Sequence, residues 1–382
     1  MHGHDLGLGA AENYLAFAQE TRGRSPAYES LAVSVAADGV VRGFLGSLPP
    51  GKRQPNLLFA AARYLLGGVP DLGGLRDLAS RGRDELAAVM LARRTQTNEP
   101  ARCATLLPAL AQLPRPLALI EAGASAGLTL LFDRYSYDYA GHKITGADPA
   151  APVLRCEPRG PVPLPDRIPE ITWRAGLDLS PLNVADDDDV RWLSCLVWPG
   201  EGDREQRLAA AVATARRDPP DVRRGDILTG LPGLAAQAPP DATLVIYHTA
   251  VLAYLTPADR ERFAAQVRAL PAVWLSNEGP GIVPGQPIPP YRGTPFVLAR
   301  DGRTILALTD SHGTWLDWHP SPQPGQGQAR GSLPGTTPIA PLCARWPLPV
   351  SDPQARPIGG YGTVSERFPW TPQRYAGCPL WW

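Results

Sequence analysis

Residues 116–134, PLALIEAGASAGLTLLFDR, decide which fold this chain is expected to adopt. An apolar run ends in Glu121 and enters a turn containing Gly123, Ser125 and Gly127, and the Leu-rich segment that follows predicts a helix. A strand, a glycine turn and a helix in this order build the nucleotide pocket of doubly wound sheets. The glycines let the backbone approach a ligand, and the helix N-terminus offers free N–H groups.

Strand and helix patterns alternate downstream of this stretch. Strands are predicted at 117–122, 171–179, 221–228, 243–251 and 272–278, with helical periodicity between them. Residues 294–313 predict two further strands around Asp301-Gly302, a dipeptide typical of a tight hairpin. Five βα-type units closed by an antiparallel hairpin predict an α/β fold with a mostly parallel, Rossmann-like sheet.

The region before residue 116 predicts helices only. Apolar residues recur three and four positions apart in residues 11–23, 25–38, 54–68, 75–96 and 101–113. We therefore expect an N-terminal helical domain at 1–115 and an α/β domain at 116–318, with an insertion at 135–170. The proline-rich segment 319–382 lacks a periodic apolar stripe, so we expect it to form no core and to be disordered.

Composition limits the class of protein. The chain has 37 basic and 37 acidic residues, which argues against a nucleic-acid partner, because non-specific binding needs an excess of positive charge. Its five cysteines lack CxxC spacing, so neither a disulfide framework nor a metal site is expected, and a reducing compartment fits best. Apolar runs stay shorter than the roughly 18 residues of a membrane span. We expect a soluble, cytoplasmic protein that binds a small molecule.

Short motifs in the α/β half resemble class I S-adenosylmethionine-dependent methyltransferases. GLDLSP (176–181) resembles the second-strand signature, whose acid binds the ribose hydroxyls, and Gly225-Asp226 resembles the third-strand end, where an acid meets the adenine amine. Residues 121–127 resemble motif one, E-x-G-x-G-x-G, with serine at the central glycine. The resemblance implies S-adenosylmethionine as the cofactor, held by Glu121, Gly123, Ser125, Gly127, Asp178 and Asp226.

The expected methyl-transfer centre lies at the end of the fourth strand. YHT (247–249) occupies that position, so Tyr247 and His248 are the candidate catalytic residues, either of which can act as a base toward a hydroxyl or amine acceptor. Asn277 and Glu278 end the fifth strand, at the edge where ligands of open α/β sheets collect. The helical region would cover the substrate side, or equally form the surface of a homodimer.

Other interpretations remain open on the same residues. Gly123, Ser125 and Gly127 also satisfy G-x-S-x-G, the nucleophile elbow of α/β-hydrolases, with Asp226 as orienting acid and His248 or His312 as base. A methyltransferase-shaped domain can also act as a binding module without catalysis. The glycines can serve packing alone and His248 can be a core residue. Residues 127 and 178 are 51 positions apart, whereas motif one and the ribose acid are usually about 20 apart.

A second resemblance covers residues 10–318. Several segments are similar to an uncharacterised bacterial family, domain of unknown function 2332: RRTQTNEPARCATLLP (93–108), EAGASAGLTLLFDRYSYDY (121–139), YHTAVLAYL (247–255) and WLSNEGPG (274–281). This resemblance implies membership of that family. It implies no activity, because the family has none assigned.

Overall fold

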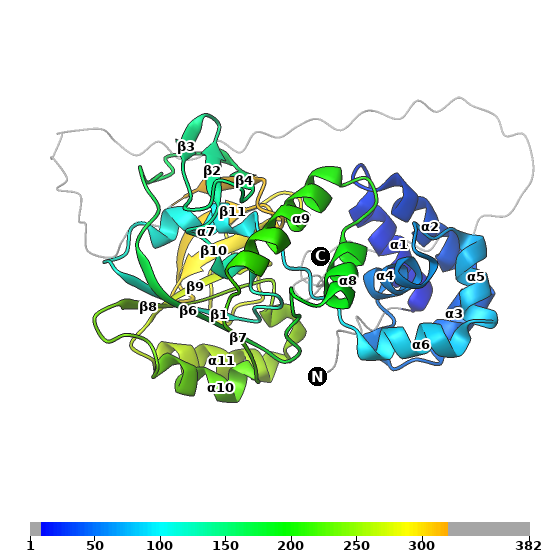
Figure 1. Cartoon of the computed structure of the whole chain (residues 1–382). Helices are drawn as coiled ribbons and strands as arrows, with labels where there is room; N and C mark the ends of the chain where they lie inside the picture. Colours follow the sequence, from blue (N-terminus) through cyan, green and yellow to red (C-terminus); the bar gives the residue numbers. More distant parts are fainter. Residues whose placement is uncertain (1–8, 320–382) are drawn as a thin grey trace, which may run out of the picture. The chain divides into compact units, whose positions relative to one another are not determined.

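Six helices make up the N-terminal part of the computed structural model, which describes residues 9–319. They are α1 (Ala10–Thr21), α2 (Pro26–Ala37), α3 (Gly39–Gly46), α4 (Pro55–Leu66), α5 (Leu72–Ser80) and α6 (Arg83–Ala92) (Figure 1). Ser25 caps α2 by accepting from the backbone N–H of Tyr28, with Pro26 in the first turn, as predicted. The predicted helix at 75–96 is two helices, and α3, capped by Asp38, was not predicted.

The N-terminal helices share a core with a segment from the α/β half of the sequence. Phe17, Tyr28 and Phe59 meet ring to ring, with centroids 4.9 Å apart for Tyr28 and Phe59. Trp192, from α8 (Asp187–Leu196), and Trp198 belong to the same buried cluster. Asp186 caps α8, so the acidic run 186–189 forms the N-terminus of this helix, where the helix dipole favours negative charge. All described residues belong to one compact unit.

The large sheet has the doubly wound order at its centre. Five parallel strands are β1 (Leu117–Ala122), β6 (Ile171–Asp178), β7 (Val222–Arg224), β8 (Thr243–Thr249) and β9 (Val273–Glu278). They lie in the order β7-β6-β1-β8-β9, which places a switch point between β1 and β8. The antiparallel strands β10 (Phe296–Arg300), β11 (Thr304–Thr309) and β12 (Trp315–Trp318) extend the sheet beyond β9. The predicted mixed α/β architecture, with a mostly parallel sheet and a terminal hairpin, is confirmed.

Helices cover both faces of this sheet (Figure 1). Leu117 and Leu119 of β1 join a core with α7 (Arg102–Leu110) and α9 (Gly202–Arg217), which we call the α7 face. Ala118 and Ile120 join a core with α10 (Ile227–Ala235) and α11 (Pro257–Arg268), the α11 face. Successive side chains of a strand point to opposite faces of the sheet, so only strand residues on the same face can contact one another.

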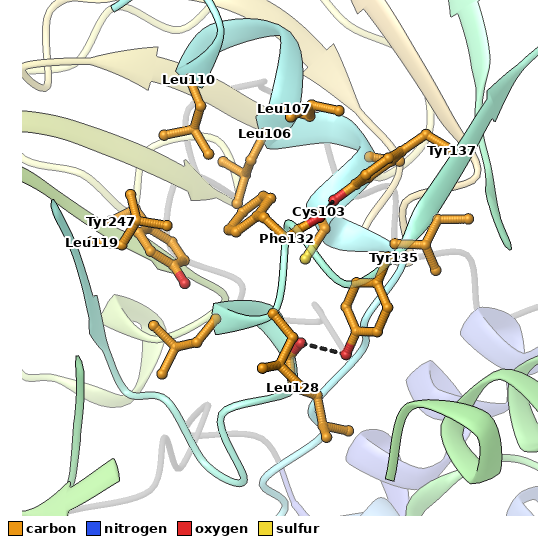
Figure 2. Close-up of a cluster of buried hydrophobic side chains, with 14 of the residues drawn as sticks. Cys103, Leu106, Leu107, Leu110, Leu119, Leu128, Phe132, Tyr135, Tyr137 and Tyr247 are labelled. Carbon is orange, nitrogen blue, oxygen red and sulfur yellow. Dashed lines mark hydrogen bonds between the residues drawn. The ribbon is translucent and has the colours of Figure 1, made fainter. Parts of the chain in front are cut away.

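The insertion at 135–170 is an ordered part of the α7 face. Its strands β2 (Ser136–Tyr139), β3 (His142–Ile144) and β4 (Val153–Arg155) form a small sheet, and β5 (Glu157–Arg159) pairs with β12. Tyr135, Tyr137 and Tyr139, which alternate along the chain, are all buried, and their hydroxyls donate to backbone carbonyls 2.7 Å away. Figure 2 shows Tyr135 and Tyr137 beside Cys103 and Phe132 in this core.

The prediction of a helix after Ser125 is wrong. A single 3-10 turn, η2 (Leu128–Leu130), follows the glycine turn before the chain enters β2. The Tyr135 hydroxyl donates to the carbonyl oxygen of Leu128, and the Tyr137 hydroxyl donates to that of Phe132, acceptors that a continuing helix would use (Figure 2). Residues 128–132 are also buried throughout, which leaves no solvent face for an amphipathic helix.

Two further predictions concern the chain ends and the membrane. The tail prediction at 319–382 falls, apart from its first residue, outside the described residues. Within residues 9–319, none of the helices combines the length and apolarity needed to cross a bilayer.

Candidate functional site

The glycine turn after β1 is closely packed against the segment that follows β8 and against β7. Gly123, Ser125 and Gly127 have φ of 77°, 52° and 74°, in the left-handed region. A Cβ added at Gly123 would lie 2.6 Å from Cγ2 of Val251, and one at Gly127 would lie 2.6 Å from Cγ2 of Val222. Packing and backbone conformation therefore both require glycine here, while Ser125 adopts a conformation that L-residues adopt at a cost of about 1–2 kcal/mol.

Asp178, at the end of β6, lies directly against this turn. Its Oδ2 accepts from the Ser125 backbone N–H at 2.9 Å, and its Oδ1 accepts from the Ser180 N–H at 2.8 Å. Oδ1 also accepts from the side-chain amide of Gln96 at 2.9 Å. The structure thus brings together two of the predicted cofactor-binding residues, Ser125 and Asp178, and adds Gln96 to them.

Gln96 belongs to a polar segment that the sequence did not single out. We predicted it at the end of a helix, but α6 ends at Ala92 and residues 93–99 run without helix or strand toward α7. The Gln96 carbonyl accepts from the Ser125 hydroxyl at 3.2 Å, and Asn98 Oδ1 accepts from the Leu128 N–H at 2.8 Å. The one available signal was a run of four polar residues, TQTN (95–98), after a helix-forming stretch.

Glu121 is buried on the α7 face, with 2 % of its surface exposed. It accepts from the hydroxyls of Thr129 and, at 3.4 Å, Tyr247. Burial, with a smaller contribution from the nearby Asp178 carboxylate, raises the pKa of Glu121 to about 8. Arg102 and the hydroxyls of Thr129 and Tyr247 act in the opposite direction but do not cancel the effect of burial. At neutral pH the side chain is therefore mostly protonated and does not present a full negative charge.

The two predicted catalytic residues lie on opposite faces of the sheet. The Tyr247 hydroxyl is on the α7 face and donates to the Thr129 carbonyl at 3.0 Å, within the apolar cluster of Figure 2. His248 is on the α11 face, fully buried against Phe263 and Trp274. The Trp274 indole donates to His248 Nε2 at 3.0 Å, so the proton lies on Nδ1, 2.7 Å from Glu278 Oε1. Both ring nitrogens are thus engaged by protein groups.

Unsatisfied polar atoms gather at the carboxyl ends of β8 and β9. Thr249 Oγ1, Asn277 Nδ2 and Glu278 Oε2 are buried and lack a hydrogen-bond partner among the described residues, although buried polar groups are normally paired. Thr249 and Asn277 are partners in the β8–β9 register, so they share the α7 face. Glu278 instead accepts the N–H groups of Val251 and Leu252 through Oε1, which holds the turn after β8.

Asp226 lies beside the end of β6, because the N–H of the preceding residue, Gly225, donates to the Asp178 carbonyl at 2.8 Å. The Asp226 carboxylate caps α10 by accepting from the Leu228 N–H at 2.9 Å. Because α10 packs with Ala118 and Ile120 on the α11 face, whereas Glu121 lies on the α7 face, the structure does not bring Asp226 to Glu121. The third strand, predicted over 221–228, ends at Arg224, since this cap starts a helix.

The predicted hydrolase residues are also apart. The Ser125 hydroxyl donates to the Gln96 carbonyl, while the hydrogen bonds of His248 go to Glu278 and Trp274. His312 contacts Arg24 and Ser311, and it lines a cavity of about 1120 Å³ beside α9. None of the residues predicted for cofactor binding or methyl transfer lines that cavity. Residues 9–319 contain no cluster of three or more His, Cys, Asp or Glu side chains placed to hold a metal ion.

Comparison with known proteins gives one match. The model of the family described as "Uncharacterized protein conserved in bacteria", domain of unknown function 2332, matches residues 11–318. No curated protein and no solved structure matches the chain.

Proposed function

Because the chain belongs to this bacterial family, whose description names no activity, we propose a function from the site geometry: an S-adenosylmethionine-dependent methyltransferase with a small-molecule acceptor. The observation that carries the proposal is the hydrogen bond from the Ser125 N–H to Asp178 Oδ2, 2.9 Å long. It ties the glycine turn of β1 to an acid at the end of β6, next to the switch point of the sheet.

The donor set at Asp178 fits a ribose. A carboxylate accepts from two vicinal hydroxyls at once, and the Gln96 amide and the Ser125 N–H now occupy that kind of position. Entry of a ribose requires Gln96 to move. The hydrogen bond from Gln96 to Asp178 is then replaced by hydrogen bonds from the ribose hydroxyls. The backbone of residues 123–127 would lie against the rest of the cofactor, whose role when bound is to supply the methyl group.

The acceptor side is proposed at the ends of β8 and β9. Asn277 Nδ2 is a free donor and Thr249 Oγ1 can donate or accept, and the two residues share the face that carries Glu121. An acceptor with a hydroxyl or amine could satisfy both atoms. We place acceptor contacts here rather than at Tyr247 and His248, whose polar atoms already have protein partners.

Calorimetric titration with S-adenosylmethionine and with its demethylated product tests the cofactor site. We expect saturable binding that is lost in Asp178→Ala. The matched control is Asp241→Ala, because Asp241 is exposed and precedes β8 at the opposite end of the strand. Absence of binding by both compounds to the wild-type protein, or equal binding by the two variants, contradicts the proposal.

A second candidate is a binding module without catalysis. Two observations support it: Gln96 is hydrogen-bonded to Asp178 and Ser180, and apolar side chains pack around Tyr247 (Figure 2). Both leave little room for an acceptor at the carboxyl ends of the parallel strands. Incubation with methyl-labelled cofactor and a bacterial metabolite extract separates the two functions. Label transferred above a heat-inactivated control identifies the enzyme, whereas binding without transfer identifies the module.

A further inference from the structure

The cavity beside α9 is built from arginine side chains. Arg204 and Arg207 come from α9, Arg24 comes from the turn before α2, and His312 comes from the turn between β11 and β12. The volume of about 1120 Å³ is at the upper end for small-molecule sites, which run from about 300 to 1,000 Å³.

Positive charge exceeds negative charge beneath this cavity. Glu99 accepts from Arg204 Nε at 2.8 Å and from Arg207 Nε at 2.7 Å. Glu201 accepts from Arg24 Nη2 at 2.6 Å and also pairs with Arg204. Three guanidinium groups thus share two carboxylates. The Arg204 side chain is only 9 % exposed, so solvent screens this imbalance weakly.

The environment of His312 shows that the electrostatic potential around its ring is positive. Burial lowers its pKa well below the usual value, and the charges of Arg204, Arg24, Arg102 and Arg207 lower it further. Arg24 Nη2 lies 2.9 Å from His312 Nδ1, and a guanidinium can only donate, so Nδ1 accepts and the ring proton lies on Nε2. A neutral imidazole surrounded by guanidinium groups leaves the excess positive charge uncompensated.

Several donors in this cavity are unused. The hydrogen bonds of the three arginines involve Nε and Nη2 of Arg24, Nε and Nη1 of Arg204, and Nε of Arg207. Their other guanidinium nitrogens, together with His312 Nε2, donate to none of the described residues. Guanidinium groups with free N–H pairs match carboxylate and phosphate oxygens in geometry and charge.

Four further acidic residues line the cavity besides Glu201, so the excess of positive charge is local to Arg24, Arg204 and Arg207 and is not a property of the whole lining. Asp138 accepts from the Gly141 N–H, and Asp310 accepts from the N–H groups of His312 and Thr314, so both are used within turns. Glu157 and Asp203 are exposed, where solvent screens their charges.

We propose that this cavity binds an anionic small molecule, whose carboxylate or phosphate group is recognised by Arg204, Arg207 and the Nε2–H of His312. The site is separate from Asp178 and does not depend on the proposed methyl transfer. The ligand replaces water on guanidinium groups that Glu99 and Glu201 already hold in position, so little side-chain entropy is lost on binding.

Titration of the full-length protein with inorganic phosphate and, separately, with acetate tests the proposal, at constant ionic strength held with chloride. Binding is followed by the NMR signals of the His312 ring, which report on folded molecules alone. We expect saturable binding of at least one anion and an upward shift of the His312 pKa when it is bound. Saturation by phosphate alone identifies a phosphate ligand, and saturation by acetate identifies a carboxylate ligand.

Arg207→Gln is the decisive variant, because Glu99 keeps Arg204 as its partner when Arg207 is lost. Its expected effect is affinity weakened by about tenfold, with an intermediate loss in Arg207→Lys, which keeps the charge but not the planar group. The control is Arg262→Gln, since Arg262 is exposed on α11. The proposal is overturned if neither phosphate nor acetate saturates the protein at a lower concentration than chloride does. It is also overturned if Arg207→Gln binds these anions as tightly as Arg262→Gln.

Discussion

Gln96 donates its side-chain amide to Asp178 Oδ1 at 2.9 Å and to the Ser180 carbonyl at 2.9 Å. A residue from the segment between α6 and α7 is thereby hydrogen-bonded to the carboxylate that the sequence motifs assign to ribose binding. Any nucleoside-type ligand at Asp178 must compete with Gln96, so loss of Asp178 should weaken binding and loss of Gln96 should strengthen it.

Removal of the Gln96 side chain should strengthen cofactor binding. In Gln96→Ala we expect S-adenosylmethionine to bind about fivefold more tightly, because the competing hydrogen bond contributes on the order of 1 kcal/mol. The protein should lose a similar free energy of unfolding. Gln112→Ala is the control, since Gln112 is exposed and its amide donates to a carbonyl of its own helix region. Calorimetry measures the affinities, and weaker binding in Gln96→Ala would show instead that Gln96 contacts the ligand.

Glu121 should make stability depend on pH. Its usual pKa of 4.5 applies to the unfolded chain, whereas burial raises the folded pKa to about 8. Between these values the unfolded state loses a proton that the folded state keeps, so the stabilisation is complete below pH 4.5 and is lost as pH rises toward 8. The loss is on the order of 5 kcal/mol, because the two pKa values differ by roughly 3.5 and each pH unit corresponds to about 1.4 kcal/mol.

The matching variant is Glu121→Gln, which keeps the size of the side chain without an ionisable group. We measure the free energy of unfolding by urea at several pH values. Its decrease between pH 4.5 and 8 that is due to Glu121 should be absent in Glu121→Gln, and the variant should be more stable than the wild type near pH 8. Parallel pH profiles for the two proteins would contradict the assignment of the slope to Glu121.

Gly123 and Val251 should be energetically coupled. Gly123→Ala places a Cβ 2.6 Å from Val251 Cγ2 and keeps a φ of 77°, so we expect a loss of roughly 2–4 kcal/mol from overpacking and backbone strain. Val251→Ala in the same chain removes the clash but not the strain. The double variant should recover at least about 1 kcal/mol relative to additivity, measured by urea unfolding in a double-mutant cycle. Additive losses would mean that the steric contact contributes nothing.

Ser125 should not react as a hydrolase nucleophile. Its hydroxyl donates to the Gln96 carbonyl at 3.2 Å, and the hydrogen bonds of His248 go to Glu278 and Trp274. Within residues 9–319, no histidine is therefore paired with Ser125 to activate it. A fluorophosphonate probe should label the wild type no more than Ser125→Ala. Labelling that disappears in Ser125→Ala, detected by mass spectrometry of the peptide, would establish the hydrolase alternative.

Strand positions could be predicted because they depend on local pattern. The run LALIEA is β1 from its first residue to its last, and the Asp301-Gly302 pair forms the predicted hairpin turn, with φ of 56° and 63°. The sequence could not show that a 3-10 turn replaces the helix predicted after Ser125. The hydroxyls that take the carbonyl acceptors come from Tyr135 and Tyr137, and their contacts depend on how the insertion folds back.

The candidate site was predictable in part. Period-two alternation already implies that Tyr247 and His248 point to opposite faces, so the sequence contained the reason that they do not form one centre. The contact of Ser125 with Asp178 follows from pairing of β1 with β6 and fits the predicted motifs. Gln96 was marked only by the polar run TQTN and His312 only as a possible hydrolase base, and Arg204 had no signal. A polar residue in a loop or on a helix gives no indication of what it contacts.

The amino-acid order by itself determined the strands, most of the helices, the left-handed glycine turn and the family, since each depends on neighbours within a few residues or on whole-sequence similarity. The three-dimensional fold alone decided that Gln96 covers Asp178, that the Asp226 carboxylate caps α10, and that arginines from α9 and the turn before α2 surround His312. These contacts join residues up to 288 positions apart. Such contacts are fixed by the packing of whole layers and the exclusion of water, and no local pattern encodes them.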